Sequence, residues 1–123
     1  MGLDMFAYKV PKKFALSDLR IDKEFFENYK GDDEFMYWRK HWDLHKWMEN
    51  LYYAKGGKGE FNCAVVRLTL DDLTSLRKTI AENRLSNGGF DLGWYTKRDD
   101  LAFIDKAIQA IEDGYEIYYD SWW

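Results

Sequence analysis

The chain has 123 residues, of which 46% are hydrophobic, 33% are charged and 19% are aromatic, and its formal net charge is −4. This balance is typical of one globular domain, because the chain is apolar enough to collapse and long enough to bury a core without disulfides or structural metal. The mild acidity argues against a general nucleic-acid binder, and the single cysteine, Cys63, excludes both an intramolecular disulfide and a zinc site built from several thiolates.

The N-terminal segment predicts a strand over residues 2–10, which ends at the chain's only proline. Alternate side chains of such a strand point to opposite faces, with Leu3, Met5 and Ala7 on one side and Asp4, Phe6 and Tyr8 on the other. Residues 11–33 are mixed in character. Ser17 predicts the N-cap of a short helical turn near Leu19.

A long central helix is predicted from Glu34 to about Ala54, because this segment lacks glycine and proline and its aromatic residues have helical spacing. On that helix Trp38, Trp42 and His45 share one broad stripe. The glycine-rich run at residues 55–59 ends the helix.

The middle of the chain predicts a buried strand followed by a helix. Residues 61–68 contain a short apolar run with β-branched side chains, and Cys63 falls inside this run. Thr69 predicts an N-cap, with Asp72 in a capping-box position, for a helix that continues to about Arg84.

The last part of the chain predicts a turn, an irregular third strand at residues 90–95 and a final helix at residues 98–113 that ends at Gly114. Residues 115–120 then alternate, as in a closing strand. Helices follow strands without regular βαβ spacing. We therefore expect residues 1–123 to form a single α+β domain, with a small, mainly antiparallel sheet of about four strands packed with three main helices.

The charge is unevenly distributed. Residues 99–123 carry a net charge of −6, whereas the rest of the chain carries +2. The acidic quarter is either a solvated helix surface or a face that attracts a basic partner. No apolar run has the length of a membrane span, and the N-terminus lacks the features of a signal peptide, so we expect a cytoplasmic protein without membrane contact.

Three stretches resemble a family of small, uncharacterised bacteriophage and prophage proteins. They are the start Gly2-Leu3-Asp4-Met5, the run Tyr37-Trp38-Arg39-Lys40 followed by His45 and Trp47, and the end, with Tyr118-Tyr119 before Trp122. The family has a GLDMY-like start and a YWRK-x4-H-x-W helix. The resemblance covers most of the chain, although Trp42 stands where the family commonly has asparagine. It implies a phage-related cytoplasmic accessory protein and no established activity.

Metal binding and catalysis find little support in the residues. His41 and His45 are four apart on the predicted helix, with Glu49 continuing the row, but further ligands would have to come from Cys63 or Asp4. A lone cysteine in an apolar run is usually an inert core residue. We expect no catalytic site, no metal and no cofactor.

The first functional hypothesis is a non-catalytic protein-binding module that acts on a host protein, such as a component of a host defence system. Exposed tyrosine and tryptophan carry most of the energy of protein interfaces, and 19% aromatic residues exceed what a core of this size needs. The predicted partner-binding residues are Tyr52, Tyr53, Trp94, Tyr95, Tyr118, Trp122 and Trp123.

The alternative is a pocket for a small anionic or nucleotide-like ligand, binding or enzymatic, because arginine suits phosphate and carboxylate and histidine titrates near neutral pH. Its predicted residues are Asp4, Trp38, Arg39, Lys40 and His45. The competing interpretation makes Trp38 a core residue, Arg39 a cation–π partner and His45 a hydrogen-bonded core residue. A homo-oligomeric role also stays open.

Overall fold

The computed structural model describes the whole chain except residues 1, 28–33, 83 and 86–96. The elements follow one another in the order β1 (Asp4–Pro11), a 3₁₀ turn (Lys12–Phe14), β2 (Ala15–Ser17), β3 (Arg20–Ile21), α1 (Lys23–Glu27), β4 (Glu34–Arg39), α2 (Trp42–Ala54), β5 (Val66–Leu68), α3 (Leu70–Ala81), α4 (Lys97–Glu112) and β6 (Tyr115–Trp122). No helix among the described residues combines the length and the apolar character needed to cross a bilayer.

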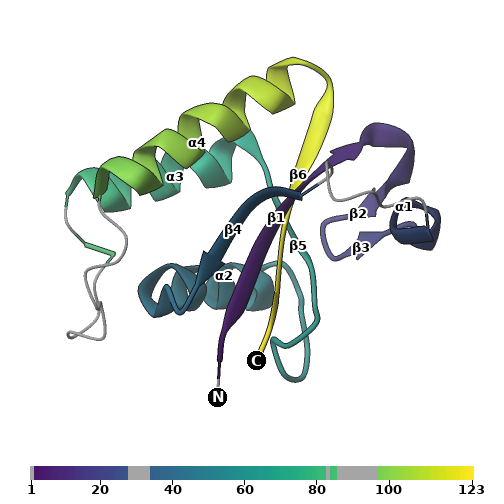
Figure 1. The fold of residues 1–123 in the computed structure, drawn as a ribbon, viewed down its shortest axis with the longest axis horizontal. Coiled ribbons are helices and arrows are strands. Elements are labelled where there is room, and N and C mark those ends of the chain that lie inside the picture. The colour runs from purple at the N-terminus through teal and green to yellow at the C-terminus, as the bar shows by residue number, and fades with distance from the viewer. Residues whose placement is uncertain (1, 28–33, 83, 86–96) are drawn as a thin grey trace.

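The main sheet has four strands in the order β4-β1-β6-β5, and every pairing in it is antiparallel. The long strands β1 and β6 lie at its centre, paired from Asp4 opposite Trp122 to Pro11 opposite Tyr115. Helices α2, α3 and α4 lie on one side of the sheet, while β2, β3 and α1 lie on the other (Figure 1). The structure therefore confirms an α+β fold in which an antiparallel four-stranded sheet is packed with three main helices.

The side of the sheet that faces the three helices, here called the core face, carries the main hydrophobic core. The sheet contributes fully buried side chains from its strands, Met5, Ala7, Trp38, Ile117 and Tyr119, and from Leu3 directly before β1. Leu44 and Met48 of α2, Leu73 and Leu76 of α3, and Phe103 and Ile104 of α4 join them in one cluster. Since fully burying a large apolar side chain contributes about 1.5–3 kcal/mol, this cluster is the main source of stability.

The opposite side, here called the outer face, carries the other alternate residues of the same strands. A smaller cluster of Tyr8, Val10, Tyr118 and Phe25 lies at one end of it, beneath β2, β3 and α1. At the other end the strands present Asp4, Phe6, Tyr37, Arg39 and Trp122, none of which is fully buried. One end of the outer face is thus packed, and the other is open.

The predicted helix over residues 34–54 is wrong in its first half, because Glu34–Arg39 forms β4 and the helix begins only at Trp42. Aromatic and β-branched residues favour strands, and the alternation of buried Trp38 with exposed Tyr37 and Arg39 has a period of two. Neither glycine nor proline marks the break. The break between strand and helix lies at Lys40, which has φ 58° and whose backbone N–H donates to Leu3 O at 2.9 Å.

Three smaller predictions also need correction or lie outside the description. Ser17 does not cap a helix: it ends β2, its hydroxyl accepts from the N–H of Leu19 at 3.3 Å, and the short helix comes later, at Lys23–Glu27. Only Val66–Leu68 of the predicted strand at residues 61–68 pairs in the sheet. The predicted strand at residues 90–95 lies outside the described residues.

Several helix-boundary predictions are confirmed. Thr69 caps α3 in a capping box: its hydroxyl accepts from the N–H of Asp72 at 3.2 Å, and the Asp72 carboxylate accepts from the N–H of Thr69 at 2.9 Å. Gly114 follows α4 with φ 100°, a conformation that glycine adopts without strain. In β6, Ile117 and Tyr119 face the core together, as the alternation of residues 115–120 predicts.

Candidate binding face

A row of aromatic rings runs along the outer face from its open end to the end covered by α1. The ring of Tyr37 lies 5.4 Å from that of Phe6, which stacks on Tyr8 at 6.3 Å, and Tyr8 in turn meets Phe26 edge-on at 5.7 Å. Cross-strand pairing explains the row, because Phe6 of β1 lies directly opposite Tyr37 of β4. Three strand residues and one residue of α1 thus form one continuous row of rings, here called the aromatic row, in which Tyr37 and Phe26 are exposed and Tyr8 is buried.

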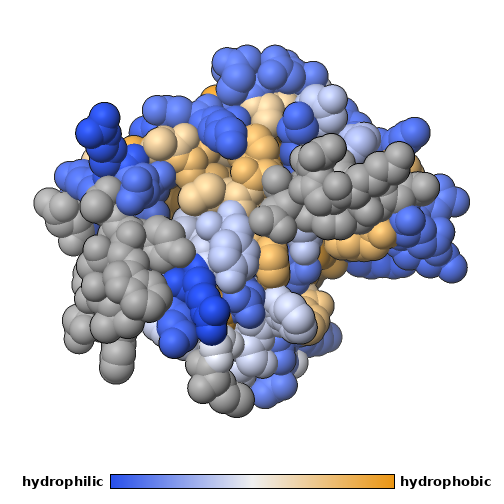
Figure 2. Space-filling model, in the orientation of Figure 1, coloured by the Kyte–Doolittle hydropathy of each residue, from blue (hydrophilic) through white to orange (hydrophobic). Residues whose placement is uncertain are grey.

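Parts of this surface are strongly exposed. The exposed fraction is 42% for Tyr37, 42% for Phe26 and 56% for Trp122 at the end of β6. In the view of Figure 2 hydrophobic residues show between hydrophilic ones near the middle, and tyrosine and tryptophan, which have intermediate hydropathy, are drawn in pale tones. Contiguous exposed aromatic side chains with polar neighbours are typical of interaction sites, whereas single exposed apolar residues need no explanation.

Two neighbouring hollows open beside the aromatic row. The first, of about 260 Å³, is lined by Phe6, Tyr8, Cys63, Asp120, Ser121 and Trp122. The second, of about 520 Å³, is lined by Leu19, Arg20, Ile21, Phe26, Cys63, Ala64, Val65 and Asp120. They share Cys63 and Asp120, so together they form one shallow groove between β6 and the hairpin of β2 and β3.

Asp120 is the carboxylate at the centre of this groove. Tyr8 donates its hydroxyl proton to Oδ2 at 3.2 Å, and the N–H of Ser121 donates to Oδ1 at 2.8 Å. Burial raises the pKa of Asp120, and these two hydrogen bonds only partly offset the increase. A cation beside this carboxylate would compensate for its lost hydration.

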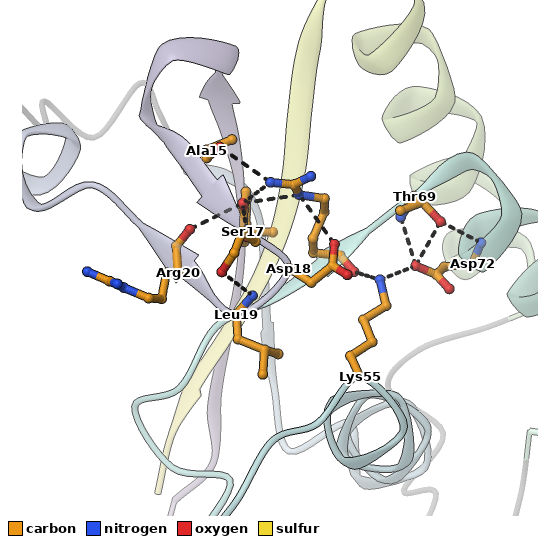
Figure 3. Close-up of polar contacts among 10 residues, drawn as sticks. Ala15, Ser17, Asp18, Leu19, Arg20, Lys55, Thr69 and Asp72 are labelled. Atoms are coloured by element: carbon orange, nitrogen blue, oxygen red, sulfur yellow. Dashed lines mark hydrogen bonds and ion pairs between the residues drawn. The ribbon is translucent and has the colours of Figure 1, made fainter.

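An arginine on β5 fixes one wall of the groove. The Arg67 guanidinium donates to the Tyr118 hydroxyl oxygen at 2.8 and 3.1 Å and to Ala15 O at 3.4 Å, and the Arg67 N–H donates to Asp18 O at 2.7 Å (Figure 3). The Tyr118 hydroxyl donates in turn to Ser17 O at 2.5 Å. The hairpin is therefore attached to the sheet through partly buried hydrogen bonds, of which those from Arg67 are charge-assisted.

The second wall, residues 61–65, is held by the end of the chain. Trp123 donates its indole N–H to Phe61 O at 2.9 Å, and its backbone N–H donates to Asn62 Oδ1 at 3.0 Å. Cys63 adopts φ 57° and donates its N–H to Ser121 O at 2.7 Å. Contrary to the expectation of a core cysteine, Cys63 is exposed in the groove.

The residues predicted to line an anion pocket lie on two sides of the sheet. Asp4 and Arg39 face each other on the outer face, where Tyr37 donates its hydroxyl to Asp4 Oδ1 at 2.5 Å. Trp38 and His45 are buried in the core, and Lys40 lies in the link between β4 and α2. None of these five residues lines either hollow.

Both histidines lie on the core side and have buried partners. His41 Nε2 lies 3.0 Å from Asp100 Oδ1, and His45 Nδ1 lies 2.7 Å from the Tyr119 hydroxyl oxygen. Burial lowers the pKa of His45 to about 4, which keeps the imidazole neutral at physiological pH. No group of three or more potential metal ligands is found within the described part of the chain.

The predicted partner-binding residues have mixed positions. Trp122, Trp123 and Tyr53 are exposed, whereas Tyr118 and Tyr52 are buried and contribute to packing. Trp94 and Tyr95 fall in the undescribed range 86–96.

Sequence reasoning missed Phe6, Tyr37, Cys63 and Asp120 as residues of this face. The alternation of residues 2–10 already placed Phe6 on the side opposite the core, and the same rule applied to residues 115–120 would have placed Asp120 there too. The incorrect helix over residues 34–54 concealed Tyr37. The exposure of Cys63 depends on a left-handed backbone conformation that no local signal predicts.

Comparisons of the chain with protein-family models, with curated proteins and with solved structures find no match. The functional argument therefore depends on the geometry of the outer face.

Proposed function

We propose that the chain is a non-catalytic protein-binding module, and that its binding surface is the open end of the outer face. The observation that carries this proposal is the aromatic row, together with the exposed Trp122 beside it. Rigid aromatic side chains bury large areas on binding and lose little conformational entropy, so they dominate interface energetics.

The strands and loops beneath this surface hold it in a fixed shape, which favours binding. Its strands β1 and β6 are the central strands of the sheet, and both walls of the groove are attached to the sheet by partly buried hydrogen bonds. A surface that is ordered before binding loses less entropy when a partner binds. The buried histidines, by contrast, lie away from the groove and its cysteine.

The resemblance to phage and prophage proteins supports a bacterial host protein as the partner and the cytoplasm of the host cell as the location. Inhibition of a host defence component is one role consistent with a small stoichiometric binder. For the alternative, an anionic-ligand pocket, no described hollow combines the predicted residues.

Affinity capture with matched variants tests the proposal. The tagged chain and its Trp122→Ser, Tyr37→Ser and Trp42→Ser variants are incubated with bacterial lysate, and bound proteins are quantified by mass spectrometry. Trp42 is the matched control, because it is a tryptophan of 38% exposure on α2, which packs on the core face. Thermal unfolding checks that every variant is folded.

The expected result is a specific partner whose recovery falls at least about tenfold in Trp122→Ser and Tyr37→Ser and is unchanged in Trp42→Ser. A partner lost only in Trp42→Ser would place binding on the helical side and contradict the proposal, as would a repeated failure to recover any partner.

A further inference from the structure

The groove of the outer face has a chemical character that narrows the class of its occupant. Among the described residues Asp120 is the one carboxylate that lines it, and it lines both hollows. The basic residue of the lining, Arg20, belongs to the second hollow only and has an exposed side chain. Within the part of the chain that the structure describes, the first hollow therefore has a carboxylate and no basic side chain in its lining.

Aromatic rings surround this carboxylate. Phe6, Tyr8 and Trp122 line the first hollow with it, and Phe26 lines the second. The face of an aromatic ring attracts a cation, and the attraction increases when the site is partly shielded from water. A carboxylate among aromatic rings is the arrangement that selects an ammonium or guanidinium group over a neutral or anionic one.

The carboxylate also has capacity for another partner. Among the described residues, one donor bonds to each Asp120 oxygen, Tyr8 to Oδ2 and the N–H of Ser121 to Oδ1, although a carboxylate oxygen offers about two acceptor sites. Burial raises the pKa of Asp120, so a neighbouring positive charge would restore part of the stabilisation that the carboxylate has lost.

Size agrees with this chemistry. A hollow of about 260 Å³ is smaller than the pockets of roughly 300–1,000 Å³ typical of complete small-molecule sites, and it suits one side chain better than a whole cofactor. The Cys63 side of this hollow is fixed by Trp123, whose indole N–H donates to Phe61 O, so the hollow exists before a partner arrives.

The geometry points to a recognition site for a basic side chain, lysine or arginine, of the partner protein, centred on Asp120 and enclosed by Phe6, Tyr8 and Trp122. This inference rests on the proposed function and adds the class of residue that the partner inserts. The acidic C-terminal quarter of the sequence, of which Asp120 is part, contributes to the attraction.

Cys63 supplies a probe for this site, because it is the chain's only cysteine, is exposed and lines both hollows. The rates of its modification by a trimethylammonium-bearing and by a sulfonate-bearing methanethiosulfonate reagent are measured, and their ratio is divided by the ratio for N-acetylcysteine amide. Taking the ratio of the two rates within each variant removes differences in thiol reactivity among the variants. The same rates are measured for Asp120→Asn and for Glu116→Gln.

Glu116 is the matched control, since it lies on the same face of β6 but outside the lining of either hollow, and its substitution removes the same unit of charge. The expected preference for the cationic reagent falls at least about threefold in Asp120→Asn and stays near the wild-type value in Glu116→Gln. An equal fall in both variants, or none in Asp120→Asn, would overturn the inference.

A second arm tests occupancy. Modification of Cys63 by a neutral methanethiosulfonate is followed while N-acetylarginine amide or N-acetylcitrulline amide is added at tens of millimolar. The arginine compound should slow the reaction in the wild type and not in Asp120→Asn. Equal effects of the two compounds, or no effect of either, would overturn the assignment to a basic side chain. Neither arm needs the partner, so failure here is distinguishable from failure of the capture experiment.

Discussion

The two faces of the central sheet are built from the same strands but are covered differently. On the core face, Met5, Trp38 and Tyr119 are fully buried under three helices. On the outer face, β2, β3 and α1 cover only one end, and Tyr37 and Trp122 remain exposed. Strand alternation assigns each residue to one face, so neighbours in sequence such as Tyr37 and Trp38 have different environments.

This difference separates stability from binding. The core face buries apolar area and should dominate the free energy of unfolding. The open outer face buries much less, and its substitutions should change binding more than folding.

The largest expected effect compares one tryptophan from each face. Trp38→Ala should lower the free energy of unfolding by about 3–5 kcal/mol, because it leaves a large cavity in the core. Trp122→Ala should change it by less than about 0.5 kcal/mol, because that side chain is 56% exposed. Urea denaturation measures both, and equal losses would contradict the division between the faces.

The second expected effect is a pH dependence that originates on the core face. The pKa of His45 is about 4 in the folded chain, below its unfolded value of 6.5, so the unfolded state binds more protons between these limits. Its contribution is fully present above pH 6.5 and is lost as the pH falls to about 4, a change of about 2–3 kcal/mol.

Urea denaturation of the wild type and of His45→Gln at several pH values measures this contribution as a difference, which cancels the titration of the remaining groups. The advantage of the wild type should shrink between pH 6.5 and 4. A constant difference across this range would show that His45 is not buried in its neutral form.

An intermediate effect is expected where the outer face is covered. Arg67→Met should lower the free energy of unfolding by about 1–3 kcal/mol, because Tyr118 and Ala15 lose the donor that joins the hairpin to the sheet. The control Arg84→Met removes an exposed ion pair with Glu82 and should cost less than about 0.5 kcal/mol. Chemical denaturation compares the two variants, and equal losses would mean that the hairpin is not held by Arg67.

The smallest effect concerns Asp120 itself. Because burial raises its pKa, the carboxylate form is penalised in the folded chain, and stability is lost as the pH rises through the folded pKa. Asp120→Asn retains an oxygen acceptor and should be neutral or up to about 1 kcal/mol more stable than the wild type at pH 7. That advantage should shrink in acid, and a large loss of stability at pH 7 would make Asp120 a structural residue.

Sequence patterns predicted the class of fold and came close to the bounds of β1, α3, α4 and β6, but missed β2, β3, α1 and β4. Thr69 and Asp72 bond the free N–H groups at the start of a helix, and Gly114 adopts the positive φ that follows a helix end. Both signals are local and needed no tertiary context. The alternation of β1 likewise assigned its residues to the correct faces.

The failures arose where tertiary pairing decided the outcome. Residues 34–39 have both helical and strand-like spacing, and their pairing with β1 selects the strand. The candidate site depends on that choice, because Tyr37 enters the aromatic row only as a strand residue. The groove was also unpredictable, since its lining comes from β1, β3, α1, β6 and residues 61–65, which only the fold brings together.

Hydroxyl-radical footprinting of the chain, free and bound to its captured partner, tests the division between the faces most directly. Tyr37, Phe26 and Trp122 of the outer surface and Trp42 and Tyr53 of α2 are all exposed in the free chain, so all five should be oxidised. We predict that the partner protects the first three and leaves Trp42 and Tyr53 unchanged. Protection of Trp42 and Tyr53, with Tyr37 and Trp122 still oxidised, would contradict the account.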